Sequence, residues 1–494
     1  MMKKLTALLL TALIAISVLG AVPAMAENYD QVTFAYMTMD QIPSDEGLAT
    51  VQEAINVIAR EKIGAEITLK PITLYDYTSS VSRSLQGGEK IDVFQTVYNF
   101  ANCVSMEMGY DITDLISTCG ADILDVMDED ILNVCRVDGR LYAVPVNRAL
   151  ASSGYFVCRK DILDELKIDV TGITSPDGLT PVFEQVKAAY PEMTMVAPLG
   201  AGQLGLELSM QEIDYLSDSD RACFGALVGD SLTVENLYES EAFKHNVELA
   251  RAWYQAGYIL KDAATTIITS QEMMASGNCF GVFTAHGLPA EELAATLSVV
   301  YNKPLIAIKL GDPYIVTSNA NIVTTMIAST TKVPEASMKF INLMYTNADV
   351  MNLLICGIEG RDYVVNEDGY VVYPEGQDAA TVPYTAQMEN ATLGNYFLIK
   401  PIIGTSESTI AYSLEQNKTA KRSPAFGFNF DPTRVGSAYT AVSNVGNQYL
   451  PGLICGSVDP ETELPKFIQA LKDAGLERIM TEKQNQLDKW LANK

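Results

Sequence analysis

Histidine and tryptophan are scarce in this chain, with 2 of each among 494 residues. Imidazole is the side chain that most often titrates near neutral pH and ligates transition metals. The cysteines form no C-x-x-C pair and no cluster with histidine, which makes a zinc site improbable. We therefore predict neither a metal nor a cofactor. The two tryptophans, Trp253 and Trp490, lie in helical patterns and are predicted to be packing residues.

Positive charge is also in short supply. Lysine and arginine total 34 against 61 acidic residues, which gives a formal charge of -27. A phosphate backbone or an anionic membrane surface requires clustered lysine and arginine. Nucleic acid is therefore excluded as the expected partner. An acidic run at residues 122–130 could bind calcium, but its spacing is not that of an EF-hand, and a solvated acidic face is the better interpretation.

Sequence signatures of common enzymes are missing. The chain has no G-x-S-x-G elbow, no H-E-x-x-H helix and no phosphate-binding P-loop. We accordingly predict no catalytic residue and no enzymatic activity. One enzymatic alternative stays open, because folding could bring together any two of the 61 carboxylates as the acid and nucleophile of a carbohydrate hydrolase.

The N-terminus has the pattern of an export signal. Lys3 and Lys4 precede an apolar run at residues 5–19, and Ala26 ends a small-x-small cleavage site. The run is shorter than the roughly 20 apolar residues that span a bilayer. We expect residues 1–26 to be a signal peptide and the mature protein to be exported, either periplasmic or extracellular. No cysteine stands among the residues directly after Leu19, so no lipobox is seen.

The 8 cysteines lie beyond this segment. An even count in an exported protein permits disulfides. Most of these cysteines stand in apolar stretches, such as residues 278–283, where a free cysteine acts as a small core residue. Free core thiols are the better interpretation.

Alternating strand and helix patterns open the mature chain. We predict strands at residues 32–36, 65–72 and 91–98, with helices at 46–58 and 75–85 between them. Such a βαβαβ unit implies a parallel sheet covered by helices. Ligands of these sheets bind beyond the carboxyl ends of the strands, which points to residues 37–40 and 99–102.

Further elements follow along the chain. They are extended runs at residues 154–158, 279–283 and 314–316, helices at 160–166 and 334–345, a hairpin at 361–374, and two C-terminal helices separated by Gly475.

Several motifs together resemble the extracellular solute-binding proteins of ABC importers, the large sugar-binding type with an extra C-terminal domain. These motifs are Asp138-Gly139-Arg140-Leu141-Tyr142-Ala143-Val144-Pro145, Cys356-Gly357-Ile358-Glu359-Gly360-Arg361-Asp362, Ser423-Pro424-Ala425-Phe426-Gly427-Phe428 and Tyr449-Leu450-Pro451-Gly452. The likeness spans nearly the whole mature chain and is weakest at about residues 172–262.

This resemblance implies an α/β, two-lobed periplasmic-binding-protein fold (type II-like) with a hinge between the lobes and a C-terminal α/β extension. We expect residues 27–148 plus 316–360 to form the N-terminal lobe. Residues 149–315 plus 361–494 would form the C-terminal lobe and its extension. The implied function is to capture a carbohydrate, an oligosaccharide or glycoside, in the cleft between the lobes and to deliver it to the permease subunits of an ABC transporter. A monomer is expected.

Candidate ligand-binding residues follow from strand ends, from the proposed crossing and from the ligand loops that the resemblance implies. The structural alternatives are an ordinary surface loop for Tyr36 and Asp40, packed rings for Tyr98 and Tyr396, and a hinge ion pair for Arg148. Glu359 could instead be part of a tight turn, and His286 a hydrogen-bonded loop residue. The full set is Tyr36, Asp40, Tyr98, Asn99, Asn147, Arg148, His286, Glu359 and Tyr396.

Overall fold

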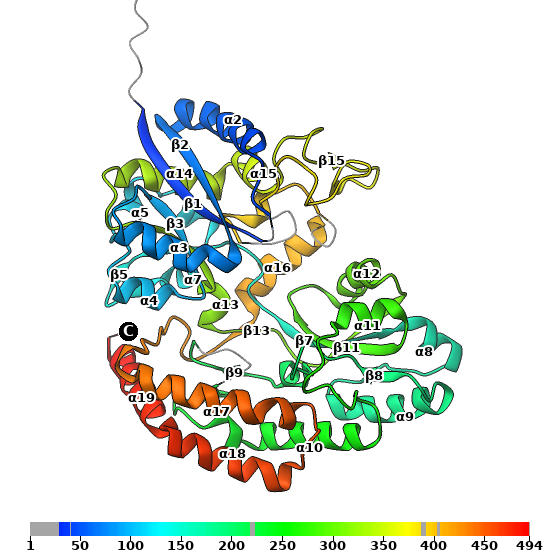
Figure 1. The fold of residues 1–494 in the computed structure, drawn as a ribbon. Helices are drawn as coiled ribbons and strands as arrows, with labels where there is room; N and C mark the ends of the chain where they lie inside the picture. The colour runs from blue at the N-terminus through cyan, green and yellow to red at the C-terminus, as the bar shows by residue number, and fades with distance from the viewer. Residues whose placement is uncertain (1–28, 40, 218–222, 387–391, 403–405, 494) are drawn as a thin grey trace, which may run out of the picture.

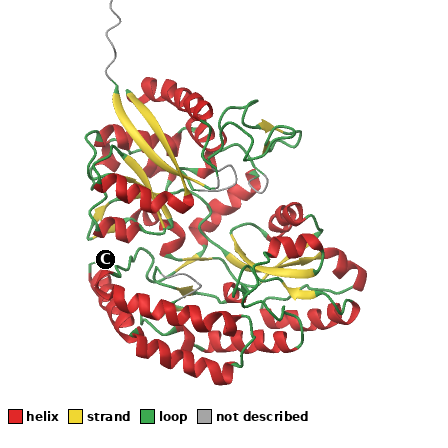
Figure 2. Ribbon diagram, viewed as in Figure 1, coloured by secondary structure: helices red, strands yellow, loops and turns green. Residues whose placement is uncertain are grey.

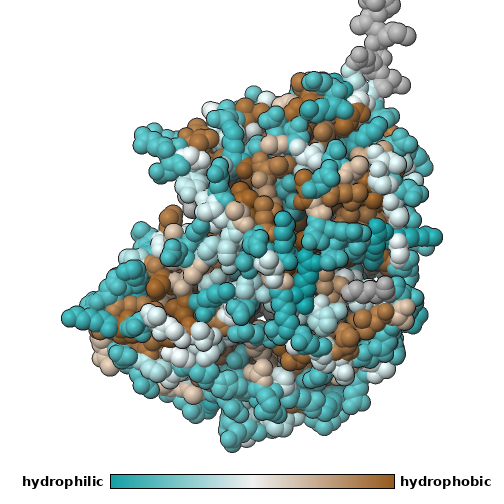
Figure 3. Space-filling model, turned by 180° about the vertical axis from the view of Figure 1, so that it is seen from behind, coloured by the Kyte–Doolittle hydropathy of each residue, from teal (hydrophilic) through white to brown (hydrophobic). Residues whose placement is uncertain are grey.

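The chain folds into two lobes stacked one above the other, with a layer of helices along the lower lobe (Figure 1). The computed structural model describes residues 29–39, 41–217, 223–386, 392–402 and 406–493. Each lobe is built around its own β-sheet. Seen from behind, hydrophilic residues cover most of the surface and separate smaller apolar patches (Figure 3).

The sheet of the first lobe has the strand order β2-β1-β3-β14-β6. Its strands are β1 (Asp30–Thr38), β2 (Ala65–Thr73), β3 (Val93–Val97), β14 (Val323–Ile327) and β6 (Ala143–Pro145). β1 pairs in parallel with β2 and β3, as the βαβαβ pattern predicts. β14 follows the second-lobe strands in the sequence and is antiparallel to β3 and β6. Two segments distant in sequence thus complete one sheet.

Helices α2 (Asp45–Ile63) and α3 (Leu74–Gln86) connect these parallel strands. The Ser44 hydroxyl caps the start of α2 by accepting from the amide of Gly47. Gly64 ends the helix at φ 65°, a conformation that favours glycine. The predicted helices at residues 46–58 and 75–85 are therefore confirmed, with slightly wider limits.

The second lobe is built on the sheet β12-β7-β11-β8. Its strands are β7 (Ser153–Arg159), β8 (Thr194–Val196), β11 (Cys279–His286) and β12 (Leu305–Lys309). Phe156 and Phe183 pack edge to face at 5.4 Å, and Phe183 packs against Trp253 at 5.0 Å. These rings form the centre of the lobe, and Trp253 is a core residue as predicted.

Helices α10 (Glu241–Gln255), α17 (Gly436–Ile454), α18 (Pro460–Ala474) and α19 (Leu476–Ala492) form the lower layer (Figure 2). Their core includes Phe243, Phe467 and Leu487 together with Phe224 from the second lobe. Gly475 separates α18 from α19 at φ 106°, so the expected pair of C-terminal helices is confirmed. The C-terminal extension is thus packed onto the second lobe.

The chain crosses between the lobes at residues 146–152, at 310–322 and along α16 (Glu407–Thr419). Asn417 of α16 accepts from the amide of Leu150 at 2.8 Å and donates to the carbonyl of Arg148 at 2.7 Å. β17 (Lys421–Arg422) then pairs in parallel with β13 (Tyr314–Ile315). These contacts bind the crossing segments to one another.

Residues 361–402 differ from the expected domain division. Tyr363, Val371, Tyr384 and Ile402 belong to the core of the first lobe, whereas the expected division placed them with the second. Tyr384 donates to the carbonyl of Leu354 at 2.9 Å. The hairpin itself is present as β15 (Val364–Val365) and β16 (Val371–Val372). A hairpin pattern predicts local pairing but carries no information about which lobe covers it.

Further helices and strands complete the two lobes. They are α4 (Phe100–Ser105), α5 (Leu115–Thr118), α6 (Ile123–Val126), α7 (Glu129–Asn133), β4 (Arg136–Val137), β5 (Arg140–Leu141), α8 (Lys160–Leu166), α9 (Thr180–Ala189), β9 (Ile213–Asp214), β10 (Leu227–Val228), α11 (Ser270–Ser276), α12 (Ala290–Tyr301), α13 (Thr317–Asn321), α14 (Pro334–Thr346) and α15 (Ala348–Cys356). The 3₁₀ helices are η1 (Pro176–Leu179), η2 (Leu206–Ser209), η3 (Leu237–Glu239), η4 (Tyr396–Leu398) and η5 (Thr433–Val435).

All eight cysteines are free in the structure, and all but Cys119 are buried. The interpretation of these residues as free core thiols is confirmed. Within the described ranges, no three histidine, cysteine or acidic side chains gather as a metal site. None of the described helices has the length and apolar character needed to span a membrane.

Candidate functional site

A cleft of about 700 Å³ lies between the two lobes. Its lining comes from the first lobe at residues 98–102, from the crossings at residues 152–154 and 318–322, from the second lobe at residues 207–213, and from the C-terminal extension at Asn429, Phe430, Pro432 and Tyr439. A molecule in this cleft would contact every part of the fold. The carboxyl end of β3 supplies the first-lobe side, as expected for such a sheet.

Tyr98 and Asn99 follow β3 and enter the cleft. The Tyr98 ring is 75% exposed, and its backbone has φ 55°, which is unusual for a residue with a side chain. The backbone is held there because the Tyr98 amide donates to the carbonyl of Ile322 at 2.8 Å. The Asn99 side chain accepts from the amide of Val97 at 2.9 Å. Both residues are predicted ligand contacts, and the structure brings them together.

Residues 207–213 line the cleft from the second lobe. They approach β7 closely because Gly154 has no side chain: a Cβ there would lie 2.6 Å from the carbonyl oxygen of Leu208. Gln211 donates to the carbonyl of Leu310 at 2.8 Å. Tyr215 follows at the same side of the cleft.

The charge of the lining is one-sided. No lysine, arginine or histidine is among the described residues that form it, whereas Glu207, Glu212 and Asp312 are. Glu212 is paired with Lys421 at 2.7 Å, and Asp312 lies 3.7 Å from Lys309. Amides, hydroxyls and tyrosine rings make up much of the remaining polar surface. This set suits a neutral polyhydroxylated ligand better than an anion.

Arg148 lies beside the cleft lining without joining it. Its guanidinium donates to the carbonyl of Asn319 at 3.2 Å, and Asn319 lines the cleft. Burial lowers the pKa of Arg148, while the charge interaction with Tyr98 opposes that shift. The residue holds α13 in place behind the cleft, which is closer to the hinge alternative than to a ligand contact.

His286 lies at the end of β11, next to the lining residue Ala285 and in register with Ser153. Its Nδ1 accepts from the amide of Leu288 at 3.1 Å, so the ring is neutral in this arrangement. The residue is exposed, yet the protein on one side of the ring removes enough water to lower the pKa of His286. The hydrogen bond to Nδ1 acts in the same direction.

Two predicted tyrosine contacts, Tyr36 and Tyr396, are core residues. Tyr36 is fully buried in β1, which runs two residues further than expected, and its hydroxyl lies 3.2 Å from that of Tyr384. Burial raises the pKa of Tyr36 strongly. Tyr396 is 8% exposed and packs in the core of the first lobe. Tyr396 packs as its structural alternative describes, whereas Tyr36 lies within a buried strand and fits neither the cleft-facing loop nor the ordinary surface loop expected for it.

Asn147 and Glu359 also lie outside the cleft lining. Asn147 is 7% exposed and donates to the carbonyl of Val126 at 3.0 Å. Glu359 is paired with Lys400, which lowers the pKa of its carboxyl group. Asp40 falls outside the described residues.

Sequence reasoning missed the lining residues Tyr215, Asn321, Asn429 and Tyr439. Tyr215 lies in the stretch where the family resemblance is weakest. Asn429 directly follows the motif at residues 423–428, so that motif could have pointed to it. Asn321 donates to the Asn429 side chain at 2.6 Å, and Asn429 donates to the carbonyl of Val134 at 2.8 Å.

A G-x-G-x-x-G spacing occurs at residues 200–205, beside the cleft. A dinucleotide site would need this loop to lead from a strand into a long helix whose N-terminus binds phosphate. Here Gly205 leads into η2, a 3₁₀ helix of 4 residues. Gly202 packs against Pro451 and Gly205 against Leu199. These glycines serve close packing.

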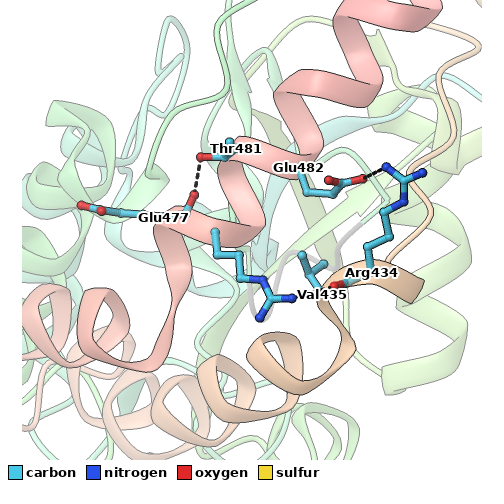
Figure 4. A pocket seen from close by; sticks show the side chains of 6 residues that line it. Arg434, Val435, Glu477, Thr481 and Glu482 are labelled. Carbon is cyan, nitrogen blue, oxygen red and sulfur yellow. Dashed lines mark hydrogen bonds and ion pairs between the residues drawn. The ribbon is translucent and has the colours of Figure 1, made fainter.

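A second, smaller hollow of about 390 Å³ lies on the C-terminal extension and is shown in Figure 4. Arg434 lies 3.6 Å from Glu482, and the Thr481 hydroxyl donates to the carbonyl of Glu477 at 2.7 Å. Arg478 donates to the carbonyl of Arg434 at 3.0 Å. The contacts of Arg434 join α19 to η5 at the surface of the extension.

Known proteins resemble this chain over nearly its whole length. A curated relative from Streptococcus pneumoniae, named a carbohydrate ABC transporter substrate-binding protein, is 29% identical over 445 residues, which are 89% of this chain and 87% of the relative. A family model described as a domain of unknown function (DUF3502) matches residues 424–492.

Solved structures agree with this result. The N-glycan transport solute-binding protein (NgtS) of S. pneumoniae is 27% identical, with a TM-score of 0.79 and coverage of 94% of this chain and 99% of that one. Its complex with Man1GlcNAc is 26% identical, with a TM-score of 0.70 and coverage of 93% and 99%. The resemblance to solute-binding proteins of ABC importers and the two-lobed α/β fold are confirmed.

Proposed function

We infer that this two-lobed solute-binding protein captures a neutral oligosaccharide in the cleft between its lobes. The observation that carries this proposal is the composition of the cleft: tyrosine rings, amides and hydroxyls from both lobes, without a basic side chain among the described lining residues. A sugar ring offers apolar C–H faces that stack on tyrosine and hydroxyls that bond to amides and carboxylates. An acidic glycan would find no positive partner among the described lining residues.

Capture follows from the division of the contacts between two lobes. Tyr98 belongs to the first lobe, whereas Tyr215 and Tyr439 belong to the second lobe and its extension. A ligand that contacts both sides stabilises the closed arrangement by the difference in its affinity for the two states. Micromolar capture requires about 8 kcal/mol of net binding free energy, which several hydrogen bonds and stacked rings can supply.

The proposed role ends with delivery to the permease subunits of an ABC transporter, with the binding protein acting as an exported monomer. The relatives named above support this role. Residues 1–26 would be removed as a signal peptide. The proposed role is non-catalytic. A hydrolase would need a proton donor and a nucleophile among Glu207, Glu212 and Asp312, and Glu212 is already neutralised by Lys421.

A thermal-shift screen followed by calorimetry tests this proposal. The mature protein is mixed with Man1GlcNAc and Man5GlcNAc, the glycans of the pneumococcal complexes, with other neutral oligosaccharides, and with a trisaccharide of galacturonic acid. A ligand at 100 times its dissociation constant stabilises the protein by about 2.7 kcal/mol. Saturable binding of an intact neutral glycan, with no shift by the acidic one, is expected.

Product analysis of each mixture separates binding from hydrolysis. A cleaved glycan would overturn the non-catalytic role, and replacing Glu207 or Asp312 by the amide would then identify the carboxylate responsible. Binding of the acidic trisaccharide in preference to neutral ones would overturn the neutral substrate class. Binding to none of the sugars would refute carbohydrate capture.

A further inference from the structure

The C-terminal extension contributes directly to the cleft, although the family model that matches residues 424–492 carries no function. Asn429, Phe430, Pro432 and Tyr439 all lie in the cleft lining. They come from the loop before α17 and from its first turn. These residues form a wall, here named the C-terminal wall, opposite the side that Tyr98 supplies.

The C-terminal wall is continuous with the second lobe. Tyr439 packs edge to face against Phe224 with ring centroids 5.1 Å apart. The ring centroid of Tyr238 lies 4.8 Å from that of Phe467 in α18. Leu216, next to the lining residue Tyr215, belongs to the same core as Phe428 and Val442. The extension and residues 211–217 therefore share one packed core.

Lys483 of α19 joins the parts of this wall from behind. Its side chain is fully buried, and its ammonium group donates to the carbonyls of Gly225 at 3.0 Å and of Tyr215 at 3.4 Å. The ammonium also lies 5.3 Å from the centroid of the Phe430 ring, within the range of a cation–π contact. One buried charge thus contacts the backbone of one lining residue and the ring of another.

A buried carboxyl group lies close to this ammonium. Asp214 is 2% exposed and accepts from the amide of Leu216 at 2.9 Å. Burial raises the pKa of Asp214, and the charge of Lys483 opposes that rise. Burying an ammonium is costly unless it is paired and hydrogen-bonded. An apolar side chain would fill the same space, but it would leave the carbonyl of Tyr215 without this donor.

We propose that the C-terminal wall determines which glycan the cleft accepts and that Lys483 is the positioning residue that holds Tyr215 and Phe430 in the wall. This inference rests on the proposed capture of a neutral oligosaccharide. It assigns a function to the extension: Tyr439 and Tyr215 supply ring faces to the sugar units furthest from Tyr98. A short glycan engages Tyr98 and part of the wall, whereas a longer glycan uses all of it.

Calorimetry with Man1GlcNAc and Man5GlcNAc on three variants tests the wall. Tyr439→Leu keeps an apolar side chain against Phe224 but removes the ring face, and Lys483→Met keeps the buried volume but removes the charge. Tyr449→Leu is the matched control. Tyr449 stands on the same helix as Tyr439, but it does not line the cleft, and its ring stacks on Phe467 with ring centroids 5.5 Å apart. Melting temperatures and circular dichroism report folding for each.

Tyr439→Leu is expected to weaken binding of the longer glycan about tenfold and that of the shorter one by less, while Tyr449→Leu binds both as wild type does. Lys483→Met should also weaken binding of the longer glycan more than binding of the shorter one, so that the ratio of the two dissociation constants shifts as it does in Tyr439→Leu. Its effect should add only in part to that of Tyr215→Leu in a double-mutant cycle, because Lys483 positions Tyr215 and also Phe430. A merely structural role would lower the melting temperature and leave the ratio unchanged.

The outcomes separate this inference from the proposed function. If wild type binds the glycans and Tyr439→Leu keeps both affinities, the wall assignment is wrong and glycan capture stands. If Tyr439→Leu changes the ratio while a folded Lys483→Met does not, the positioning role of Lys483 is wrong. If wild type binds none of the sugars, capture and the inference that rests on it both fail.

Discussion

Tyr98 combines an exposed ring with a strained backbone at the end of β3. A non-glycine residue in the left-handed region costs of order 1 kcal/mol, and such strain persists only where the surroundings impose it. The bond from its amide to the carbonyl of Ile322 imposes it here. Because the ring points into the cleft instead of packing in the core, its removal should affect binding far more than folding.

Tyr98→Gly is therefore predicted to weaken glycan binding about tenfold or more, while the melting temperature stays close to that of wild type. Glycine relieves the strain at φ 55° but raises the entropy of the unfolded chain, and the two effects are of similar size. Calorimetry and thermal melting measure the two quantities. The control is Tyr396→Phe, a ring in the first-lobe core, which should retain full affinity. Unchanged binding by Tyr98→Gly would contradict the assignment.

The protonation of His286 gives a second prediction at this scale. Its pKa is lowered below 6.5, so the unfolded chain binds more protons than the native protein in the window just below that value. Stability should therefore fall as the pH drops from about 7.5 to about 5.5, and it should fall less in His286→Gln. Melting temperatures of both proteins across this range measure the difference. Identical pH profiles would remove His286 as the responsible group.

Single residues show where sequence reasoning reached its limit. Tyr36 and Tyr98 both stand near the carboxyl end of a predicted strand, yet one is fully buried and the other is 75% exposed. The difference arises because β1 continues to Thr38 between two neighbouring strands, whereas β3 ends at Val97. Strand ends are poorly defined by local pattern, so the correct loop can be predicted more readily than the correct side chain.

At the scale of elements, α16 fastens the crossings together through one side chain. Asn417 is 5% exposed and bonds to the backbone of both Leu150 and Arg148. Removing it leaves a buried amide and a buried carbonyl without their partners, and an unsatisfied buried group costs about 1 to 3 kcal/mol. The lobes meet at this point, so the loss should also loosen the hinge.

Asn417→Ala is predicted to lower the free energy of unfolding by about 2 kcal/mol. Urea denaturation measures this change, and the exposed Asn278→Ala, at the start of the second-lobe strand β11, is the control with an expected effect near zero. A stability equal to wild type would show that water replaces the lost partners and that the crossing does not depend on Asn417.

Elements were predicted well where a local pattern decides them. The βαβαβ unit and the helix pair around Gly475 follow from hydrophobic period and glycine position, and both are present. Residues 361–402 were assigned to the wrong lobe core because that choice depends on contacts such as Tyr384 with Leu354. The C-terminal wall was missed for the same reason: Asn429 and Tyr439 reach the cleft only through tertiary packing.

The cysteines give a prediction for the whole molecule. Burial raises the pKa of Cys103, Cys356 and Cys455 to about 12, which suppresses the reactive thiolate. The native protein should therefore react slowly with an alkylating reagent, and mainly at the partly exposed Cys119. In denaturant without a reductant, mass spectrometry should find all eight thiols alkylated. Fewer than eight alkylated thiols would reveal a disulfide and contradict the interpretation of the cysteines as free core thiols.

Closure of the lobes is the property that links the cleft to transport. The chain matches one NgtS structure with a TM-score of 0.79 and the NgtS complex with Man1GlcNAc with a TM-score of 0.70. Because the lining is divided between both lobes, a bound glycan gains contacts when they approach. We predict that saturating glycan reduces the radius of gyration in small-angle X-ray scattering, and that Tyr98→Gly at the same glycan concentration stays near the unliganded value. Binding without such a decrease would refute hinge closure and leave a preformed site, in which Tyr98 and the C-terminal wall already stand at their final separation.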